Sequence, residues 1–240
     1  MNVKITYLYH SSFAVETPGH FLIFDYYDDT PRGAGLSEGV IDPAELAGKN
    51  VVVFASHRHP DHYSSVVFGW RKEIPGIRYV LSDDIRTDEP AERMRPGETR
   101  SFDGMNVRTL RSTDEGVAFL VETDGFRIYH AGDLNWWRWD ENSDRENEKM
   151  EQDYKREIEK LKGEKIDLAF LPVDPRQEKD ALLGIGFFMD TVGADRVVPM
   201  HSFGDTEFFD LLKTDERAAP YRDRILFYRS RGEQLSYSEE

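Results

Sequence analysis

Residues 51–62 read Val-Val-Val-Phe-Ala-Ser-His-Arg-His-Pro-Asp-His. The apolar, mostly β-branched run Val51–Ala55 predicts a buried strand. Three of the seven histidines of the chain, and one aspartate, lie in the six-residue stretch 57–62 after this run: His57, His59, Asp61 and His62. A polar loop at the end of a strand is a common place for ligand-binding side chains. The stretch therefore predicts a strand that delivers a cluster of imidazole and carboxylate groups.

The spacing within this cluster indicates two adjacent metal positions. Alternate side chains of an extended segment point the same way, so His57 and His59 can converge on one ion. Asp61 and His62, beyond Pro60, turn toward a neighbouring position. Imidazole and carboxylate are both good ligands for divalent metals.

The composition narrows the chemistry of the site. The 240 residues include no cysteine, which excludes disulfides, cysteine nucleophiles and thiolate ligands, so His, Asp and Glu must hold any metal. Lys and Arg number 31 against 46 Asp and Glu, a net charge of −15 that disfavours nucleic acid as a partner. No stretch approaches the roughly 20 apolar residues that span a bilayer, so we expect no membrane partner.

The chain shows no internal repeat, low-complexity tract or linker, and we expect residues 1–240 to form a single domain. The first residues, Met-Asn-Val-Lys-Ile-Thr-Tyr, lack the features of a signal peptide. We therefore expect a cytoplasmic protein. The sequence does not specify an oligomeric state.

Short runs of β-branched and aromatic residues predict a strand-rich protein. The predicted strands are Val3–Tyr9, Phe13–Glu16, Phe21–Phe24, Val51–Ala55, Tyr79–Leu81, Val107–Leu110, Val117–Glu122, Phe126–Tyr129, Leu168–Leu171, Val197–Met200 and Ile225–Tyr228. Apolar residues at helical spacing predict a helix over 144–162, which begins with a Ser143–Glu146 capping box. Shorter helices are expected after His62, over 180–192 and over 206–213. This mixture predicts an α/β fold of layered sheets covered by helices.

The His-x-His-x-Asp-His motif after a strand resembles the metal-binding signature of the metallo-β-lactamase superfamily. The resemblance implies a four-layer αββα sandwich with the site at one end, between the sheets. Asp25 resembles the early structural aspartate of that superfamily, Asp133 in Gly132-Asp133 its bridging carboxylate, and His201 its last histidine ligand. The implied ligands from these motifs are His57, His59, Asp61, His62, Asp133 and His201. His10-Ser11-Ser12 and the segment 129–133 resemble most the branch that contains the ascorbate-phosphate lactonase.

The chain departs from that pattern at one ligand. Where the superfamily has a third histidine of the first metal position, this chain has Ser112-Thr113-Asp114-Glu115-Gly116. Asp114 is either a substitute ligand or a turn aspartate that caps its own loop. Oxygen ligands weaken the preference for zinc. We therefore expect one or two divalent ions, with zinc favoured and manganese or iron as alternatives.

The resemblance implies a metal-dependent hydrolase. A metal-activated hydroxide would attack the carbonyl or phosphoryl centre of a small molecule, such as a lactone, amide, ester or phosphoester. Asp133 would bridge two ions, and Asp61 would act as both ligand and proton acceptor. A nuclease of the same superfamily and a non-catalytic metal-binding domain of the same fold are the alternatives.

Candidate substrate contacts lie outside the ligand motifs. His10 could donate to the substrate or orient a ligand, Arg176 would suit an anionic substrate, and Trp136, with its neighbours Trp137 and Trp139, could form a wall of the site. His20, in a Pro-Gly turn, is expected at the surface.

Overall fold

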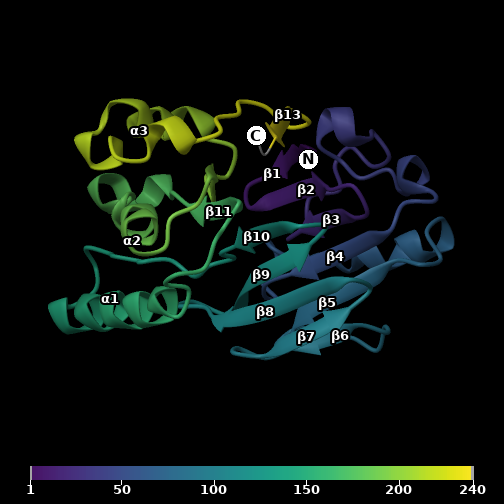
Figure 1. Ribbon diagram of the computed structural model, residues 1–240, viewed down its shortest axis with the longest axis horizontal. Coiled ribbons are helices and arrows are strands. Elements are labelled where there is room, and N and C mark those ends of the chain that lie inside the picture. Colours follow the sequence, from purple (N-terminus) through teal and green to yellow (C-terminus); the bar gives the residue numbers. More distant parts are fainter. Residues whose placement is uncertain (1, 239–240) are drawn as a thin grey trace.

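The computed structural model describes residues 2–238, and two β-sheets packed face to face form its centre (Figure 1). The first sheet has the strand order β13 (Gln234–Ser238), β1 (Asn2–Tyr9), β2 (Ser12–Glu16), β3 (Phe21–Phe24), β4 (Val51–Ala55), β5 (Arg78–Ser82) and β6 (Glu92–Met94). The second sheet has the order β12 (Arg196–Met200), β11 (Leu168–Pro172), β10 (Phe126–His130), β9 (Val117–Thr123), β8 (Met105–Arg111) and β7 (Thr99–Phe102).

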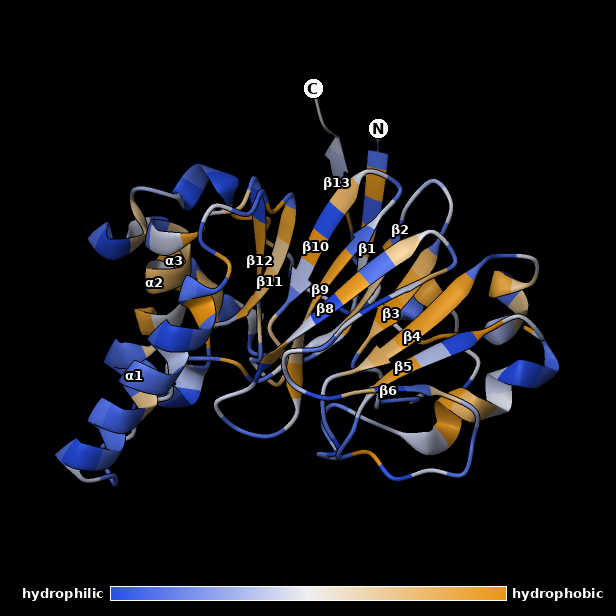
Figure 2. Ribbon diagram, turned by 60° about the horizontal axis from the view of Figure 1, so that its bottom comes forward, coloured by the Kyte–Doolittle hydropathy of each residue, from blue (hydrophilic) through white to orange (hydrophobic). Residues whose placement is uncertain are grey.

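Helices cover the outer face of each sheet (Figure 2). The α-helices are α1 (Asp144–Glu159), α2 (Leu183–Thr191) and α3 (Leu211–Thr214). The 3-10 helices are η1 (Leu36–Glu38), η2 (Pro43–Leu46), η3 (Ser65–Lys72), η4 (Pro175–Asp180), η5 (Thr206–Asp210), η6 (Glu216–Ala218) and η7 (Arg222–Arg224). This arrangement is the four-layer αββα sandwich that the sequence predicts.

Strand β4 shows how the sequence produces two cores. Its alternate residues Val52 and Phe54 are buried between the two sheets. Val51, Val53 and Ala55 face the other way and are buried with residues of η2 and η3. Because both faces are buried, the strand reads as a continuous apolar run rather than an alternating one. The loop that carries the histidine motif therefore leaves from a rigid strand.

The helix predicted over 144–162 is present as α1 and ends at Glu159. The predicted capping box is confirmed, because the Ser143 hydroxyl accepts from the Glu146 amide and the Glu146 carboxylate accepts from the Ser143 amide. Tyr154 and Ile158 of α1 are fully buried against the second sheet and α2.

The parallel parts of the two sheets position the site. Strands β3, β4 and β5 run parallel, as do β10, β11 and β12. Parallel strands present their carboxyl ends at the same edge of a sheet, which is where ligands bind in open α/β sheets. Loops from both sheets therefore meet at one end of the sandwich.

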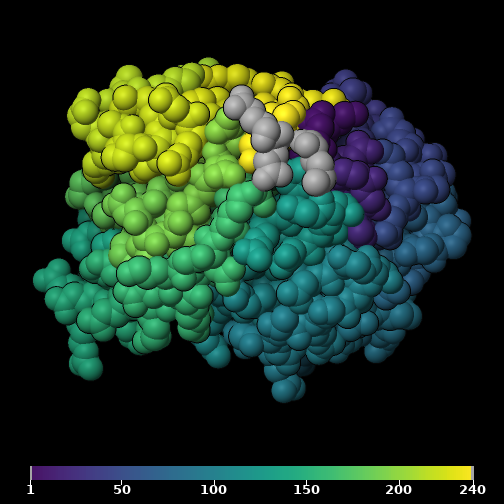
Figure 3. Space-filling model, viewed as in Figure 1, coloured from purple at the N-terminus to yellow at the C-terminus, as the bar shows by residue number. Residues whose placement is uncertain are grey.

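Some predictions about local structure are wrong. Ile225–Tyr228 is not a strand: only a single bridge joins Ile225 to Val197. Strand β13, which the polar residues of 234–238 conceal in the sequence, instead pairs with β1, so the C-terminal segment lies beside the N-terminal strands (Figure 3). His20 is only 8% exposed, because its Nδ1 lies 2.9 Å from Asp124 Oδ2 in the turn between β9 and β10.

No helix among residues 2–238 is long and apolar enough to cross a membrane.

Gly116 lies where the loop between β8 and β9 touches the loop after β4. Its φ is +71°, and a Cβ atom there would lie 2.0 Å from the Ser56 carbonyl oxygen. Gly97 has a similar φ of +82° but no atom within 4 Å of an added Cβ. Of these two glycines, Gly116 alone combines an unfavourable backbone conformation with a steric clash.

We expect Gly97→Ala to lower the free energy of unfolding by about 1–2 kcal/mol through its left-handed conformation alone. Gly116→Ala should cost roughly 1–3 kcal/mol more, because overpacking adds to the same backbone cost. Urea denaturation of both variants measures the difference. Equal losses in the two variants would contradict the close approach at Ser56.

Candidate metal centre

Strand ends supply the polar side chains that gather at this end of the sandwich. The motif 57–62 follows β4, and Asp133 follows β10 of the other sheet. Asp25 directly follows β3, and His201 directly follows β12. His10 lies in the turn between β1 and β2. Segments nearly 200 positions apart in the sequence thus contribute to one buried centre.

The first group of donor atoms comes from His57, His59 and Asp133, and these atoms lie within 4.8 Å of one another. His57 Nε2 is 3.1 Å from His59 Nδ1 and 3.4 Å from Asp133 Oδ2. Asp114 lies beside the group, with its Oδ2 atom 3.8 Å from His59 Nδ1. The structure thus brings the Asp114 carboxylate next to the first donor group.

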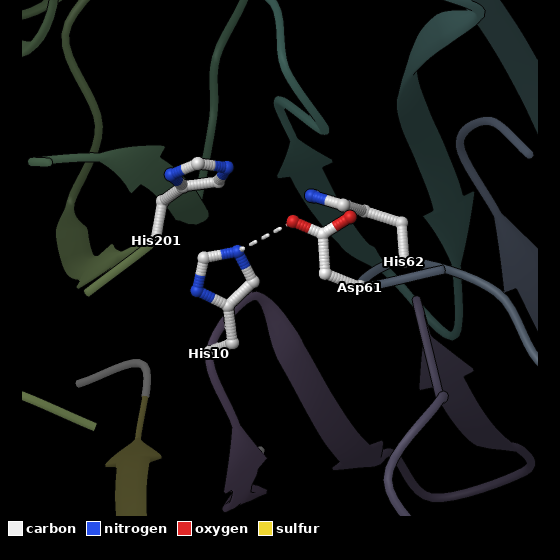
Figure 4. A group of neighbouring side chains, drawn as sticks. All are labelled: His10, Asp61, His62 and His201. Carbon is white, nitrogen blue, oxygen red and sulfur yellow. Dashed lines mark ion pairs between the residues drawn. The ribbon is translucent and has the colours of Figure 1, made fainter. Parts of the chain in front are cut away.

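The second group comes from His10, Asp61, His62 and His201, whose donor atoms also lie within 4.8 Å of one another (Figure 4). Asp133 faces this group too, because its Oδ1 atom is 3.2 Å from Nε2 of both His62 and His201. One carboxylate oxygen of Asp133 therefore points to each group, as a bridging ligand requires.

The side chains at the second group fit a cation. Four buried atoms around it have no hydrogen-bond partner: His10 Nε2, His62 Nε2, Asp133 Oδ1 and His201 Nε2. Each unsatisfied buried polar atom costs about 1–3 kcal/mol. A divalent ion would satisfy the imidazole and carboxylate lone pairs that converge here.

Buried carboxylates orient two of these histidines. His62 Nδ1 lies 2.8 Å from Asp25 Oδ2, and His201 Nδ1 lies 2.9 Å from Asp174 Oδ2. A carboxylate only accepts, so Nδ1 of each ring carries a hydrogen, and in the neutral ring Nε2 has the free lone pair that a metal needs. This is the usual support for a metal-binding histidine.

The backbone around the centre adopts conformations that non-glycine residues rarely take. The φ angles of His10, Asp25, His201 and Phe203 are +55°, +48°, +71° and +51°. Such conformations cost of order 1–3 kcal/mol each and are concentrated at functional sites. Gly132, which precedes Asp133, has no such conformational cost because it is a glycine. A side chain would also not fit there, since a Cβ atom would lie 2.7 Å from Ser56 Cβ.

His130 ties the turn of His10 to the loop of Asp133. Its Nε2 atom lies 2.9 Å from the Ser11 carbonyl oxygen, and its Nδ1 atom accepts from the Gly132 amide at 3.2 Å. Both ring nitrogens are used in this way, and the ring is fully buried. His130 therefore has a structural role here.

The charges of the centre shift the pKa values of its members. Burial alone lowers the pKa of His201, but the carboxylates of Asp133 and Asp174 outweigh it and raise this pKa to about 9. Burial alone raises the pKa of Asp133, yet His62 and His201 hold it well below its usual value. Burial lowers the pKa of His57 to about 4. Metal-free His201 is thus protonated at neutral pH.

Zinc binding should therefore displace a proton from His201. Below pH 9 the metal competes with that proton, so the apparent zinc affinity should rise about tenfold per pH unit for each proton displaced and level off above about pH 9. Competition with a chelator at pH 6.5, 7.5 and 8.5 measures the slope, and His201→Asn should reduce it. An affinity that is independent of pH over this range would contradict the assignment.

A cavity of about 210 Å³ opens onto the centre. It is lined by Thr113, Asp114, Asp133, Trp137, Trp139, Met150, Arg176 and His201. Trp136 is not part of this lining: its ring packs 6.4 Å from the Phe187 ring, and Lys155 Nζ lies 4.4 Å from its centre. The two following tryptophans, not Trp136, form the aromatic wall.

Arg176 is held at the cavity by several contacts. Its guanidinium group donates to the fully buried Asp174. It also lies 5.7 Å from the Trp139 ring and 5.1 Å from the Phe203 ring. Such cation–π contacts fix the position of a cationic group next to the candidate site.

Sequence reasoning missed two contributors to the centre. Asp174 follows β11 as Asp25 follows β3, so its place at a strand end was an available signal. Phe203 is 43% exposed and stacks on the His10 ring with 3.8 Å between the ring centres. Nothing in the local sequence distinguishes Phe203 from a core aromatic.

Residues 4–147 match the family model described as the beta-lactamase superfamily domain. The chain belongs to this superfamily. The solved structure of Igni18, a metallo hydrolase from Ignicoccus hospitalis, covers 100% of both chains with a TM-score of 0.69 and 19% identity. At that identity the likeness shows a shared fold and no more.

Curated relatives carry a functional name. A UPF0173 metal-dependent hydrolase from Korarchaeum cryptofilum is 26% identical over 210 residues, which cover 83% of this chain and 82% of the relative. Another, from Pelotomaculum thermopropionicum, is 27% identical over 149 residues, 55% of this chain and 62% of the relative. The match thus spans about three-fifths of the length of the latter protein.

Proposed function

We propose that this superfamily member is a metal-dependent hydrolase that cleaves a small carbonyl or phosphoryl substrate. The main observation behind this proposal is the position of Asp133 between the two donor groups. Its Oδ2 atom faces the first group and its Oδ1 atom faces the second. The name of the relatives, metal-dependent hydrolase, supports it.

The residues of the centre would bind two metal ions, and one of them would also accept a proton. His57, His59 and Asp133 would hold one ion, and Asp61, His62, His201 and Asp133 a second. A divalent ion bound here would lower the pKa of a bound water to about 7 and would polarise the oxygen of the bond that is cleaved. The Asp61 side chain is 30% exposed, so it can accept a proton from the site and pass it to solvent. Zinc is the favoured metal, with manganese or iron as alternatives.

The cavity supports a small substrate with a negative charge. Its volume of about 210 Å³ lies below the roughly 300–1,000 Å³ typical of sites for drug-sized ligands. Arg176 is the single arginine or lysine among the described residues that line it. Trp137 and Trp139 supply apolar walls. A compact lactone or ester with an acidic group fits this combination.

The alternative functions are a nuclease and a non-catalytic metal-binding domain, and one experiment separates them from the proposed hydrolase. The net charge of −15 weighs against a nuclease, because phosphate backbones bind cationic surfaces. A non-catalytic metal-binding domain would bind the ion without turnover. Incubation of the zinc- and manganese-loaded protein with lactone, ester, amide, phosphodiester and structured RNA substrates separates them. Bound metal with no turnover of any substrate would overturn the proposed hydrolase.

We expect His62→Ala and Asp133→Ala each to lower activity by at least about 10³-fold. The residues of the centre act as one unit, so the loss of one of them removes most of the catalysis. His62→Ala should also lose about one metal equivalent per chain, and Asp133→Ala should weaken both positions. Mass spectrometry of metal content and turnover assays measure these effects. Glu148→Gln, at an exposed position of α1, is the control. Full metal retention in either site variant would refute the ligand assignment.

We expect Asp114→Ala to lower affinity for the first metal by about 10–100-fold, the usual effect of losing a group that supports a metal site. The second metal should be unaffected. Glu115→Gln is a matched control, because Glu115 also lies near His59 but is paired with Arg58. Titration with zinc against a chelator measures both. Unchanged affinity in Asp114→Ala would leave Asp114 as a turn residue.

A further inference from the structure

His10 differs from the other histidines of the second group. Its side chain is fully buried, and its Nε2 atom faces the donor atoms of Asp61, His62 and His201 (Figure 4). The nearest ion-pair partner of Nε2 is Asp61 Oδ2, at 3.6 Å. That distance is too long for a hydrogen bond, and Nε2 has no hydrogen-bond partner.

The other ring nitrogen decides what Nε2 can do. His10 Nδ1 accepts a hydrogen bond from the backbone amide of Phe203 at 3.0 Å. An amide N–H can only donate, so Nδ1 must keep its lone pair and the imidazole is neutral, with its one hydrogen on Nε2.

This is the opposite arrangement from that of His62 and His201. In those rings Nδ1 donates to Asp25 and Asp174, which leaves the Nε2 lone pair free for a metal. His10 Nε2 instead presents a hydrogen to the same space. A nitrogen that carries a hydrogen cannot ligate a cation, so the three rings divide into two ligands and one donor.

The ring of His10 is held in this orientation. It stacks on the Phe203 ring at 3.8 Å, and the His10 amide donates to the Tyr7 hydroxyl at 2.9 Å. The His10 carbonyl oxygen accepts from the His201 amide at 3.3 Å. The turn between β1 and β2 is therefore joined to the loop after β12 through Phe203 and His201.

We propose that His10 is not a metal ligand but a catalytic hydrogen-bond donor, whose Nε2–H binds the substrate oxygen on which negative charge develops. The proposal rests on the proposed hydrolase function. The hydrogen stays on Nε2 throughout, and the bond strengthens as charge builds on the carbonyl or phosphoryl oxygen. The ligands of the second metal position are then Asp61, His62, His201 and Asp133.

The variant His10→Asn tests this role. Asparagine tolerates the left-handed backbone of position 10, and its side-chain oxygen can still accept from the Phe203 amide. It has no group at the place of Nε2. We expect unchanged zinc content, a fall in turnover of about 10²–10³-fold, as for other lost oxyanion donors, and about tenfold weaker binding of inorganic phosphate to the zinc-loaded protein.

His62→Asn is the matched control and should lose about one zinc per chain. Loss of one zinc from His10→Asn would make His10 a ligand and overturn the proposal. Retained zinc with turnover and phosphate affinity within about threefold of the unmodified protein would overturn it as well.

Nitrogen NMR of the zinc-loaded protein, with isotope-labelled histidine, tests the proposal without a variant, because it reports which ring nitrogen carries a hydrogen. We expect a hydrogen on His10 Nε2 and none on Nδ1; the reverse would refute the donor role. If the unmodified protein turns over no substrate, the proposed function fails, yet zinc content, phosphate binding and NMR still report whether His10 is a ligand or a donor.

Discussion

The buried carboxylate of Asp25 is the interaction on which the centre depends. It accepts from the Ser56 amide and hydroxyl, each at 2.7 Å, and from His62 Nδ1 at 2.8 Å. These bonds join the end of β3 to the loop after β4. Ser56 is also the contact point of Gly116 and Gly132, which lie in loops next to strands of the second sheet. One fully buried charge therefore sets both the position of the motif and the close approach of the two sheets.

The same hydrogen bonds set the chemistry of each histidine. Imidazole has two nitrogens, and the partner of one decides whether the other donates or accepts. Carboxylates face Nδ1 of His62 and His201, whereas a backbone amide faces Nδ1 of His10. Three buried rings within one centre consequently have different hydrogen-bonding partners at Nδ1. The acidic composition of the chain contributes directly, because Asp25 and Asp174 are among its buried carboxylates.

Much of this arrangement could be predicted from the sequence. The run Val51–Ala55 and the motif after it are local features, and local patterns specify strands and the loops that follow them. Asp133 and His201 lie at strand ends, and it was the resemblance to the superfamily, in the order of its motifs, that associated them with the cluster. The aromatic wall could not be assigned in the same way: which of three neighbouring tryptophans faces a cavity depends on how helix α2 packs, and Trp136 packs against Phe187 of that helix.

The sequence by itself determined the residue types available for metal binding and the strand ends that carry them, because strands follow from short-range patterns of apolar residues and a cysteine-free chain leaves only imidazole and carboxylate ligands. Only the tertiary structure decided which atom of each residue is available. Phe203 lies 193 positions from His10, and Asp174 lies 27 positions from His201. The bond between Phe203 and His10 depends on the packing of the two sheets, and that between Asp174 and His201 on the pairing of β11 with β12. Both determine donor and acceptor roles that no local pattern records.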